Sequence, residues 1–486
     1  MRNGRKALLV AVIAFVTAAT GFAEGVDAVA PEAVSGPTDL GTLGGDACAY
    51  DVNDTGTVIG TSDRTNGRDF GGFVWTTDQG MVDPLPDETD WTQIDSLNNQ
   101  GDLLINRNLR RANGDLTPIS TIISPNASAA SVNDSLEIAG SFVDAQFRNH
   151  AMFWSEATGR VDLGTLGSAD ARAHRINRHG AIYGTRTTSG GWTRAFTWAP
   201  GGVVTNLGAL GGTSSDVNPV GINDSGWIAG TATVAEGANR PFVWRPGIGM
   251  TNLGTLGGFE AEAIAINNRG QVLGRSQTGA FLQPDRYFIW HPSTGLVDIG
   301  LGVGPSPSFS ATDFNDHAQI VGTISSPAAV EAATWDAVNG LQTLAGSAGR
   351  ARAINNHGQV VGCTFIAEAG ESHAALWTVE TPVQVHWSAA EYARIQQLVT
   401  FYDMDYDELT RFGVYVAAFI NGIDPSPTPT PITVDPPGTA HTQTITWQPD
   451  EIALLEAVKH RWVLDDEDAH RWGYLLLSFI ATLQGA

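Results

Sequence analysis

The chain has 486 residues, and its 51 acidic and 27 basic side chains give a formal net charge of −24. This charge argues against nucleic-acid binding, because a phosphate backbone is bound by a basic surface that displaces its counterions. Hydrophobic residues make up 42%, enough for a packed core, while 56 glycines and a charged fraction of 16% indicate a turn-rich globular protein.

The first 23 residues are typical of a secretory signal peptide. Arg2, Arg5 and Lys6 precede an apolar run over residues 7–19, and Gly21 and Ala23 supply small residues for a cleavage site. The run is too short to span a membrane, and no later segment is long enough to do so. We therefore predict a secreted, periplasmic or cell-surface protein that is not inserted in a membrane once the signal, residues 1–23, is removed.

Internal repeats dominate the rest of the chain. The string Leu-Gly-Thr-Leu-Gly, or a close variant, follows an acid or amide at positions 39, 162, 206 and 252. An Asn follows an apolar residue at intervals of 35 to 48 residues, and an apolar doublet ending in Trp recurs between these Asn positions. The second copy lacks the Trp, and the spacing puts Arg110 in its place. The eight Asn are Asn53, Asn98, Asn133, Asn177, Asn223, Asn267, Asn315 and Asn355, and the seven Trp are Trp75, Trp154, Trp198, Trp244, Trp290, Trp335 and Trp377.

Each copy has the pattern of four short strands. A Gly stands three residues after the Asn in six copies, where a left-handed turn backbone would strain other residues, and Leu136 and Ala318 replace it in two. A four-stranded sheet of about 43 residues cannot bury both faces until neighbours pack on it. We predict an all-β protein with an eight-bladed β-propeller over residues 38–383. Seven blades are the alternative.

The copies also resemble the extracellular HAF repeat proteins, named for a His-Ala-Phe string. The resemblance is carried by the segments 150–154 (HAMFW) and 373–377 (HAALW), with variants at 194–198 and 240–244. Together with the Leu-Gly-Thr-Leu-Gly strings it covers roughly residues 38–380. It implies secreted, propeller-like repeats and supplies no activity, since that family has no established one.

A different pattern follows residue 381. Trp387 and Trp447, and Arg411 and Arg471, are among the pairs that align at an offset of 60. Ser388 with Glu391 has the form of a helix capping box. The duplication predicts a small α-helical module of two helical hairpins, 384–422 and 446–486, joined by a Pro-rich linker over 423–445.

Several polar patterns suggest metals or nucleophiles, but each has a simpler structural interpretation. The Asn turns resemble oxygen-rich calcium loops, yet turn geometry alone accounts for Asn there. The acids in residues 403–407 are spaced as in a calcium loop, but Glu408 and Val414 stand where an EF-hand needs Gly and Glu. His174 and His179 match no zinc spacing. Ser347 lacks the first Gly of a nucleophile elbow, and the repeated Trp residues fit the blade core better than sugar platforms. We predict no metal, no cofactor and no catalytic residue.

The second repeat departs from the pattern in its charges. Arg107, Arg110 and Arg111 place three cations within five residues of an acidic chain, and Trp91 lies in the preceding loop. Such a patch could bind an anionic sugar or a carboxylate, and these four residues are the candidate ligand site. The alternative, which we favour, is a degenerate blade with solvated arginines.

The two cysteines, Cys48 and Cys363, lie five residues before the first turn Asn and eight after the last. These positions stand at similar heights in blades that become neighbours only if the ring closes. A disulfide between them would lock the first blade to the last, whereas two buried thiols are the alternative.

We interpret the protein as a binding or structural scaffold that recognises a glycan or an extracellular protein through loops on one propeller face. The alternative is an extracellular propeller hydrolase or lyase acting on polysaccharide, and we expect an enzyme less than a scaffold. An enzyme would show a pocket with acids or His of perturbed pKa from several blades. A scaffold would show a channel lined alike in every blade.

Overall fold

The computed structural model describes residues 36–64, 70–86, 92–168, 170–211, 216–279, 284–302, 308–346 and 348–379, and the backbone of 381–387 and 441–447. The chain divides into one unit over Val34–Thr378 and another made of Met1–Ala33 and Val379–Ala486. The predicted signal peptide and most of the predicted helical hairpins lie outside the described residues. Among those described, no helix has both the length and the apolar character needed to cross a membrane.

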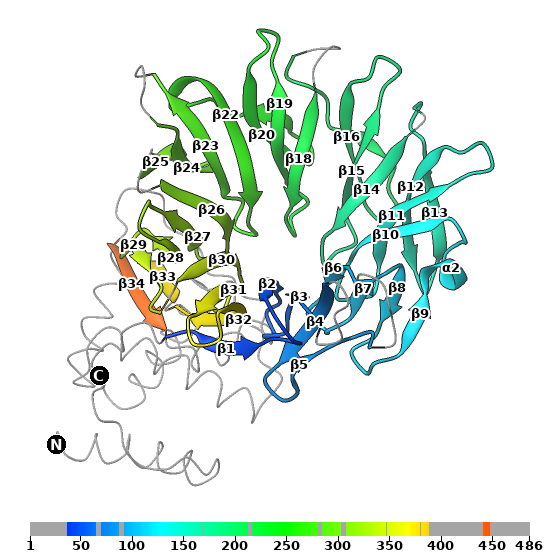
Figure 1. Ribbon diagram of the computed structural model, residues 1–486. Coiled ribbons are helices and arrows are strands. Elements are labelled where there is room, and N and C mark those ends of the chain that lie inside the picture. The colour runs from blue at the N-terminus through cyan, green and yellow to red at the C-terminus, as the bar shows by residue number, and fades with distance from the viewer. Residues whose placement is uncertain are drawn as a thin grey trace, which may run out of the picture. The chain divides into compact units, whose positions relative to one another are not determined.

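The larger unit is an eight-bladed β-propeller, as the sequence predicted (Figure 1). Within the described residues it consists of eight antiparallel four-stranded sheets arranged in a ring. From inner to outer strand, the first four blades are β2 (Ala47–Val52), β3 (Val58–Ser62), β4 (Gly71–Thr76) and β5 (Gly80–Val82); β6 (Ile94–Leu97), β7 (Leu103–Ile105), β8 (Asn108–Arg110) and β9 (Leu116–Pro118); β10 (Ala127–Val132), β11 (Ile138–Val143), β12 (Asn149–Ser155) and β13 (Gly159–Gly164); and β14 (Ala171–Ile176), β15 (Ile182–Thr187), β16 (Thr193–Trp198) and β17 (Thr205–Asn206).

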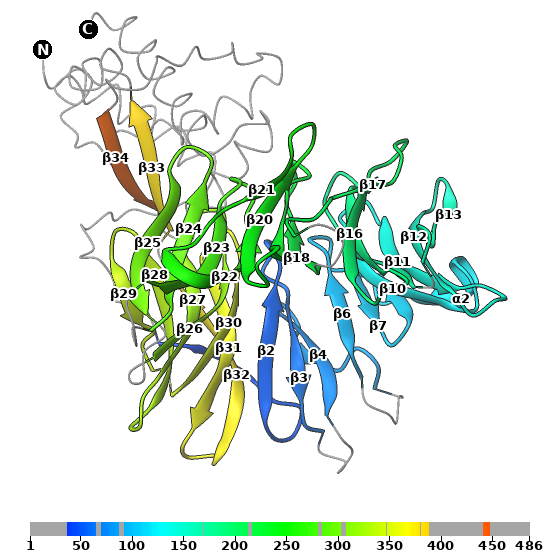
Figure 2. The same cartoon turned by 90° about the horizontal axis from the view of Figure 1, so that it is seen from above.

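The other four blades follow the same order. They are β18 (Val217–Ile222), β19 (Ile228–Thr233), β20 (Asn239–Arg245) and β21 (Gly249–Asn252); β22 (Gly257–Ile266), β23 (Val272–Thr278), β24 (Arg286–His291) and β25 (Gly295–Gly302); β26 (Ser308–Phe314), β27 (Ile320–Ser325), β28 (Val330–Asp336) and β29 (Gly340–Thr343); and β30 (Gly349–Ile354), β31 (Gln359–Ile366) and β32 (Glu371–Thr378) with β1 (Thr38–Gly41). A single turn of helix, α2 (Ile119–Ile122), lies beside the third blade (Figure 2).

The ring closes because a strand from the N-terminal end completes the last blade, which the repeat pattern did not predict. The first Leu-Gly-Thr-Leu-Gly string does not belong to the first blade, because its strand β1 pairs with β32 and becomes the outer strand of the eighth. Cys48 of β2 and Cys363 of β31 form a disulfide with Cα atoms 4.6 Å apart. Two links therefore join the beginning of the propeller to its end.

The eight turn Asn residues form a second closed ring. Each side-chain Nδ2–H donates to the backbone carbonyl of the corresponding Asn in the next blade, over 2.8–3.1 Å. The side-chain Oδ1 accepts the N–H four residues later, as Asn223 does from Trp227. All eight residues are buried, so the Asn serves both its own turn and the contact with its neighbour.

The backbone of these turns has the left-handed form that the sequence predicted. Gly56 and Gly270 have φ of 80° and 74°. Leu136 and Ala318, which replace Gly in the third and seventh copies, are held at φ 58° nonetheless. The repeat therefore imposes one turn geometry even where the residue disfavours it.

The core lies between neighbouring blades. In one cluster, Val243 and Leu253 of the fifth blade pack against Val272, Phe288 and Trp290 of the sixth. Six of the seven repeated Trp side chains are at most 9% exposed, which agrees with their interpretation as core. In the second blade Arg110 pairs with Leu103 in the register that Trp residues occupy elsewhere, as predicted from spacing.

The two repeated strings contact each other across the outer strands of a blade. The first residue of the His-Ala string pairs with the acid that precedes Leu-Gly, as His150 Nδ1 does with Asp162 at 2.9 Å. His373 makes the same contact with Asp39 of β1 at 2.8 Å, across the closure of the ring.

The described part of the second unit is a strand pair, β33 (Thr381–Trp387) with β34 (His441–Trp447). Its central pair, Gln384 and Thr444, occupies equivalent positions of the 60-residue duplication, so the two copies meet symmetrically. These strands correct the predicted boundaries. Residues 384–387 are not helical, and residues 441–445 are not part of an extended linker, because the alternating β-branched residues there favour pairing.

Candidate ligand site in the central channel

The inner strand of every blade carries a bulge at the residue three before the turn Asn. A bulge re-aims a side chain and breaks the alternation of faces, so successive residues can both face the channel. The eight bulge residues differ widely in chemistry. They are Tyr50, Asp95, Ala130, His174, Val220, Ile264, Thr312 and Arg352. Of these, Asp95, Ala130 and His174 line one cavity, whereas Tyr50 and Ile264 pack against the core between blades.

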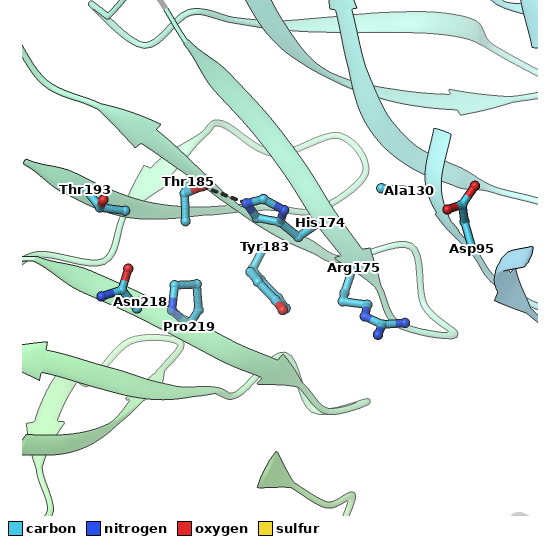
Figure 3. Close-up of a pocket in the computed structure, with 9 residues that line it drawn as sticks. All are labelled: Asp95, Ala130, His174, Arg175, Tyr183, Thr185, Thr193, Asn218 and Pro219. Atoms are coloured by element: carbon cyan, nitrogen blue, oxygen red, sulfur yellow. Dashed lines mark hydrogen bonds between the residues drawn. The ribbon is translucent and has the colours of Figure 1, made fainter. Parts of the chain in front are cut away.

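A cavity of about 490 Å³ lies against the inner strands of blades two to five. Its size falls in the range of small-ligand sites. Its lining residues are drawn in Figure 3 and are predominantly polar: Asp95, Ala130, His174, Arg175, Tyr183, Thr185, Thr193, Asn218 and Pro219.

Arg175 and Tyr183 give the cavity two polar groups that the protein leaves available. They are cross-strand partners on β14 and β15, and the guanidinium and the phenol oxygen point the same way, into the open centre (Figure 3). Arg175 is exposed, and no residue in the described ranges forms an ion pair or hydrogen bond with its guanidinium. The ring of Tyr183 is 5% exposed, and its hydroxyl likewise has no hydrogen-bond partner there. Burial raises the pKa of Tyr183, so the hydroxyl keeps its proton.

His174 stands beside Arg175 because of the bulge. Its Nε2 lies 2.6 Å from Thr185 Oγ1, which fixes the ring (Figure 3). Burial, with the nearby Arg172 and Arg175 charges, lowers the pKa of His174 below its usual 6.5. The imidazole is therefore neutral at pH 7.

Asp95 supplies the one carboxylate among the residues that line this cavity. It is exposed and accepts a hydrogen bond from Gln93 Nε2 at 2.7 Å. Partial burial raises its pKa. The cavity thus presents a cation and a carboxylate, with neutral donors between them.

Two further acids lie deeper, at the level just above the turns. Asp313 accepts backbone N–H groups from Phe314 at 2.9 Å and from Ile354 of the next blade at 3.0 Å. Burial raises the pKa of Asp313 to about 7, and that of Asp51 is raised for the same reason. The positive charge of Arg175 opposes this rise in both pKa values without cancelling it. Arg175 also lines a smaller cavity of about 340 Å³.

The arginines of the second repeat do not gather at one point. Arg107 is in the two-residue turn before β8 and donates to the carbonyls of Pro125 and Ala127. Arg111 follows β8 at its other end and is ion-paired with Glu156. Arg110 has no ion-pair or hydrogen-bond partner among the described residues, and Trp91 lies outside them. A binding role for this patch stays a prediction.

Sequence reasoning considered His174 only as a metal ligand with His179 and did not single out Arg175 or Tyr183. The structure separates the two histidines: His174 faces the channel, and His179 lies in the exposed turn after β14. No cluster of three His, Cys, Asp or Glu suited to a metal occurs in the ranges described. The available signal was the pairing of a titratable and a basic residue, His174-Arg175, directly before the turn of one repeat.

No protein-family model matches the chain, and no curated protein matches it. Solved structures with a similar arrangement include a prolyl endopeptidase (11% identity, TM-score 0.44, covering 69% of this chain and 55% of that one). They also include the β-propeller domain of the Trilobed protease from Pyrococcus furiosus (10% identity, TM-score 0.39, covering 68% and 95%). A third is the Aleuria aurantia lectin in complex with Fucα1-6GlcNAc (10% identity, TM-score 0.27, covering 63% of this chain and 96% of that one). The chain spans little more than half the length of the prolyl endopeptidase. The fold defines the class as an eight-bladed β-propeller protein.

Proposed function

We propose that this propeller is an extracellular binding protein whose central channel holds a saccharide bearing a carboxylate. The observation that carries this proposal is the pair of unpartnered polar groups, Arg175 and the Tyr183 hydroxyl, that point into one cavity. A guanidinium offers a planar fork of donors that matches a carboxylate. A ligand carboxylate would give Arg175 the partner that the described protein residues do not.

The other lining groups suit the hydroxyls of a sugar. Thr185, Thr193 and Asn218 bring hydroxyl and amide groups from blades four and five. Asp95 can accept hydrogen bonds from sugar hydroxyls on the opposite side. The strong polarity of the cavity favours such a ligand over an apolar one, since apolar groups would leave these donors and acceptors unpaired.

Binding is tested by titration calorimetry with short oligomers of galacturonate, using neutral galactose oligomers as the ligand control. The full-length chain should bind the acidic oligomers and not the neutral ones. Arg175→Ala should weaken binding about ten- to a hundredfold, the worth of one charge-assisted hydrogen-bonding group. Arg286→Ala removes the same charge from an exposed pair with Asp298 and should bind as the wild type does. Equal affinity of Arg175→Ala and the wild type, or no acidic binding at all, would overturn the proposal.

A further inference from the structure

We infer that the channel site cleaves the uronate it binds by β-elimination, with His174 as base, Arg175 on the carboxylate and Tyr183 as acid. This inference rests on the proposed function, because it needs a uronate whose carboxylate is held by Arg175. It adds an activity to that binding site.

The bulge in β14 makes the arrangement possible. In a regular strand His174 and Arg175 would point to opposite faces, but the register shift between Ala173 and Arg175 lets both line the same cavity. Tyr183 is the cross-strand partner of Arg175, and its ring centroid lies 6.0 Å from that of His174. A base, a cation and a hydroxyl donor thus line one cavity.

The reaction needs these three groups and no co-reactant. The carboxylate on C5 of a uronate makes the C5 proton acidic, and Arg175 neutralises the negative charge that develops there. His174 takes the C5 proton, and the electron pair of that C–H bond forms a double bond between C4 and C5. The C4–O4 bond breaks, and O4 leaves with its electron pair and takes the proton of the Tyr183 hydroxyl. Proton return from His174 to Tyr183 through solvent restores the site.

The protonation states fit these roles. The neutral His174 can accept a proton at pH 7, and the protonated Tyr183 can donate one. Two titratable groups whose environments push their pKa values apart are the usual basis for assigning a base and an acid. In the tautomer in which His174 Nε2–H donates to Thr185 Oγ1, Nδ1 has the free lone pair that takes the proton.

Elimination is detected by the ultraviolet absorbance of the conjugated double bond that forms beside the carboxylate. The full chain is mixed with oligomers of galacturonate or mannuronate, and binding is measured on the same samples. His174→Gln should lower the elimination rate by about a hundredfold or more while binding changes little, and Tyr183→Phe should lower the rate by a far larger factor than it weakens binding. Arg286→Ala, outside the channel, should leave both unchanged.

The pH profile gives a second readout, because it follows the groups that transfer protons. The rate should fall on the acid side below the usual His pKa of 6.5, as His174 gains a proton, and on the alkaline side only above pH 10, as Tyr183 loses one. Binding of a uronate without any new absorbance would overturn the elimination and leave the proposed binding intact. Undiminished elimination in His174→Gln would overturn the assignment of the base. Absence of binding would overturn both proposals.

Discussion

The side chain of Asn355 donates a hydrogen bond to the backbone carbonyl of Asn53, 302 residues earlier in the chain, over 2.8 Å. It is the eighth of eight equivalent bonds and the one that closes their ring. The neighbouring backbone repeats the closure, since Asn356 N–H donates to Asp54 Oδ1 at 3.0 Å. The junction between the last and first blades therefore has the same Asn–Asn bond as the seven others, in addition to its disulfide and the outer strand β1.

The first prediction concerns this ring of Asn side chains. Asn223→Ala removes a donor to the Asn267 carbonyl, in a buried hydrogen bond, and an acceptor for Trp227 N–H, in a partly buried one. We expect a loss of about 2–4 kcal/mol in the free energy of unfolding by denaturant, since buried groups are left unsatisfied. Asn113→Ala, in an exposed turn, should change it by no more than about 0.5 kcal/mol. Equal effects of the two substitutions would contradict the structural role of the ring.

The disulfide leads to a second prediction. Because Cys48 and Cys363 are 315 residues apart, the chain-entropy estimate of their contribution is about 6 kcal/mol, as an upper value. Replacing both with Ser should lower the unfolding midpoint, and a reducing agent should lower that of the wild type alone. Thiol titration of the unreduced, denatured protein should find no free thiol. Two free thiols per chain would show that the bond does not form.

The pairing of β1 with the eighth blade can be tested through the contact between His373 and Asp39. Partial burial alone would lower the pKa of His373, but its hydrogen bonds with Asp39 and Glu371 raise it above 6.5. The stabilisation is therefore complete below pH 6.5 and is lost as the pH rises through the raised pKa. The protection of the β1 amides from hydrogen exchange, corrected for the intrinsic rate at each pH, should fall over that rise.

His150→Ala provides the matched control for His373→Ala. Both substitutions remove a His that contacts an acid on the outer strand of its blade, but only His373 contacts the strand that closes the ring. His373→Ala should abolish the pH dependence of the β1 protection, and His150→Ala should leave it intact. If both variants behave like the wild type, the contact does not hold the strand.

The channel acids lead to a prediction on pH and stability. Burial raises the pKa of Asp313 to about 7, so the folded state binds a proton that the unfolded state does not between about pH 4 and pH 7. Stability should rise as the pH falls through this window, by at most about 1.4 kcal/mol per pH unit. Asp313→Asn should reduce this slope in denaturant unfolding measured across the window. An unchanged slope would mean that Asp313 titrates normally.

The sequence predicted the ring of blades because its evidence repeats. Eight Asn turns and seven Trp positions mark the same places in each copy, and one geometry suits them all, including Leu136 and Ala318. The pairing of β1 with the eighth blade was not predicted, because the first Leu-Gly-Thr-Leu-Gly string has the same sequence whether its strand pairs with β4 or with β32. Only the closed ring decides between them.

The channel site was missed for a related reason. Arg175 and His174 lie in one repeat and Asp95 in another, and only the ring brings Asp95 to the same cavity. The bulge that turns both His174 and Arg175 inward leaves little signal in the sequence, because its residue differs in every blade. The clustered arginines of the second repeat are a stronger sequence signal, yet Arg107 and Arg111 contact residues of the third blade.

The most direct test of the channel site is a crystal structure of the protein soaked with a galacturonate oligomer, refined alongside the unsoaked protein. The account predicts ligand density in the cavity between blades two and five, with one carboxylate within hydrogen-bonding distance of the Arg175 guanidinium and a sugar oxygen beside Tyr183 Oη. Density at Arg110 on the second blade instead, or an empty channel at saturating oligomer, would contradict it.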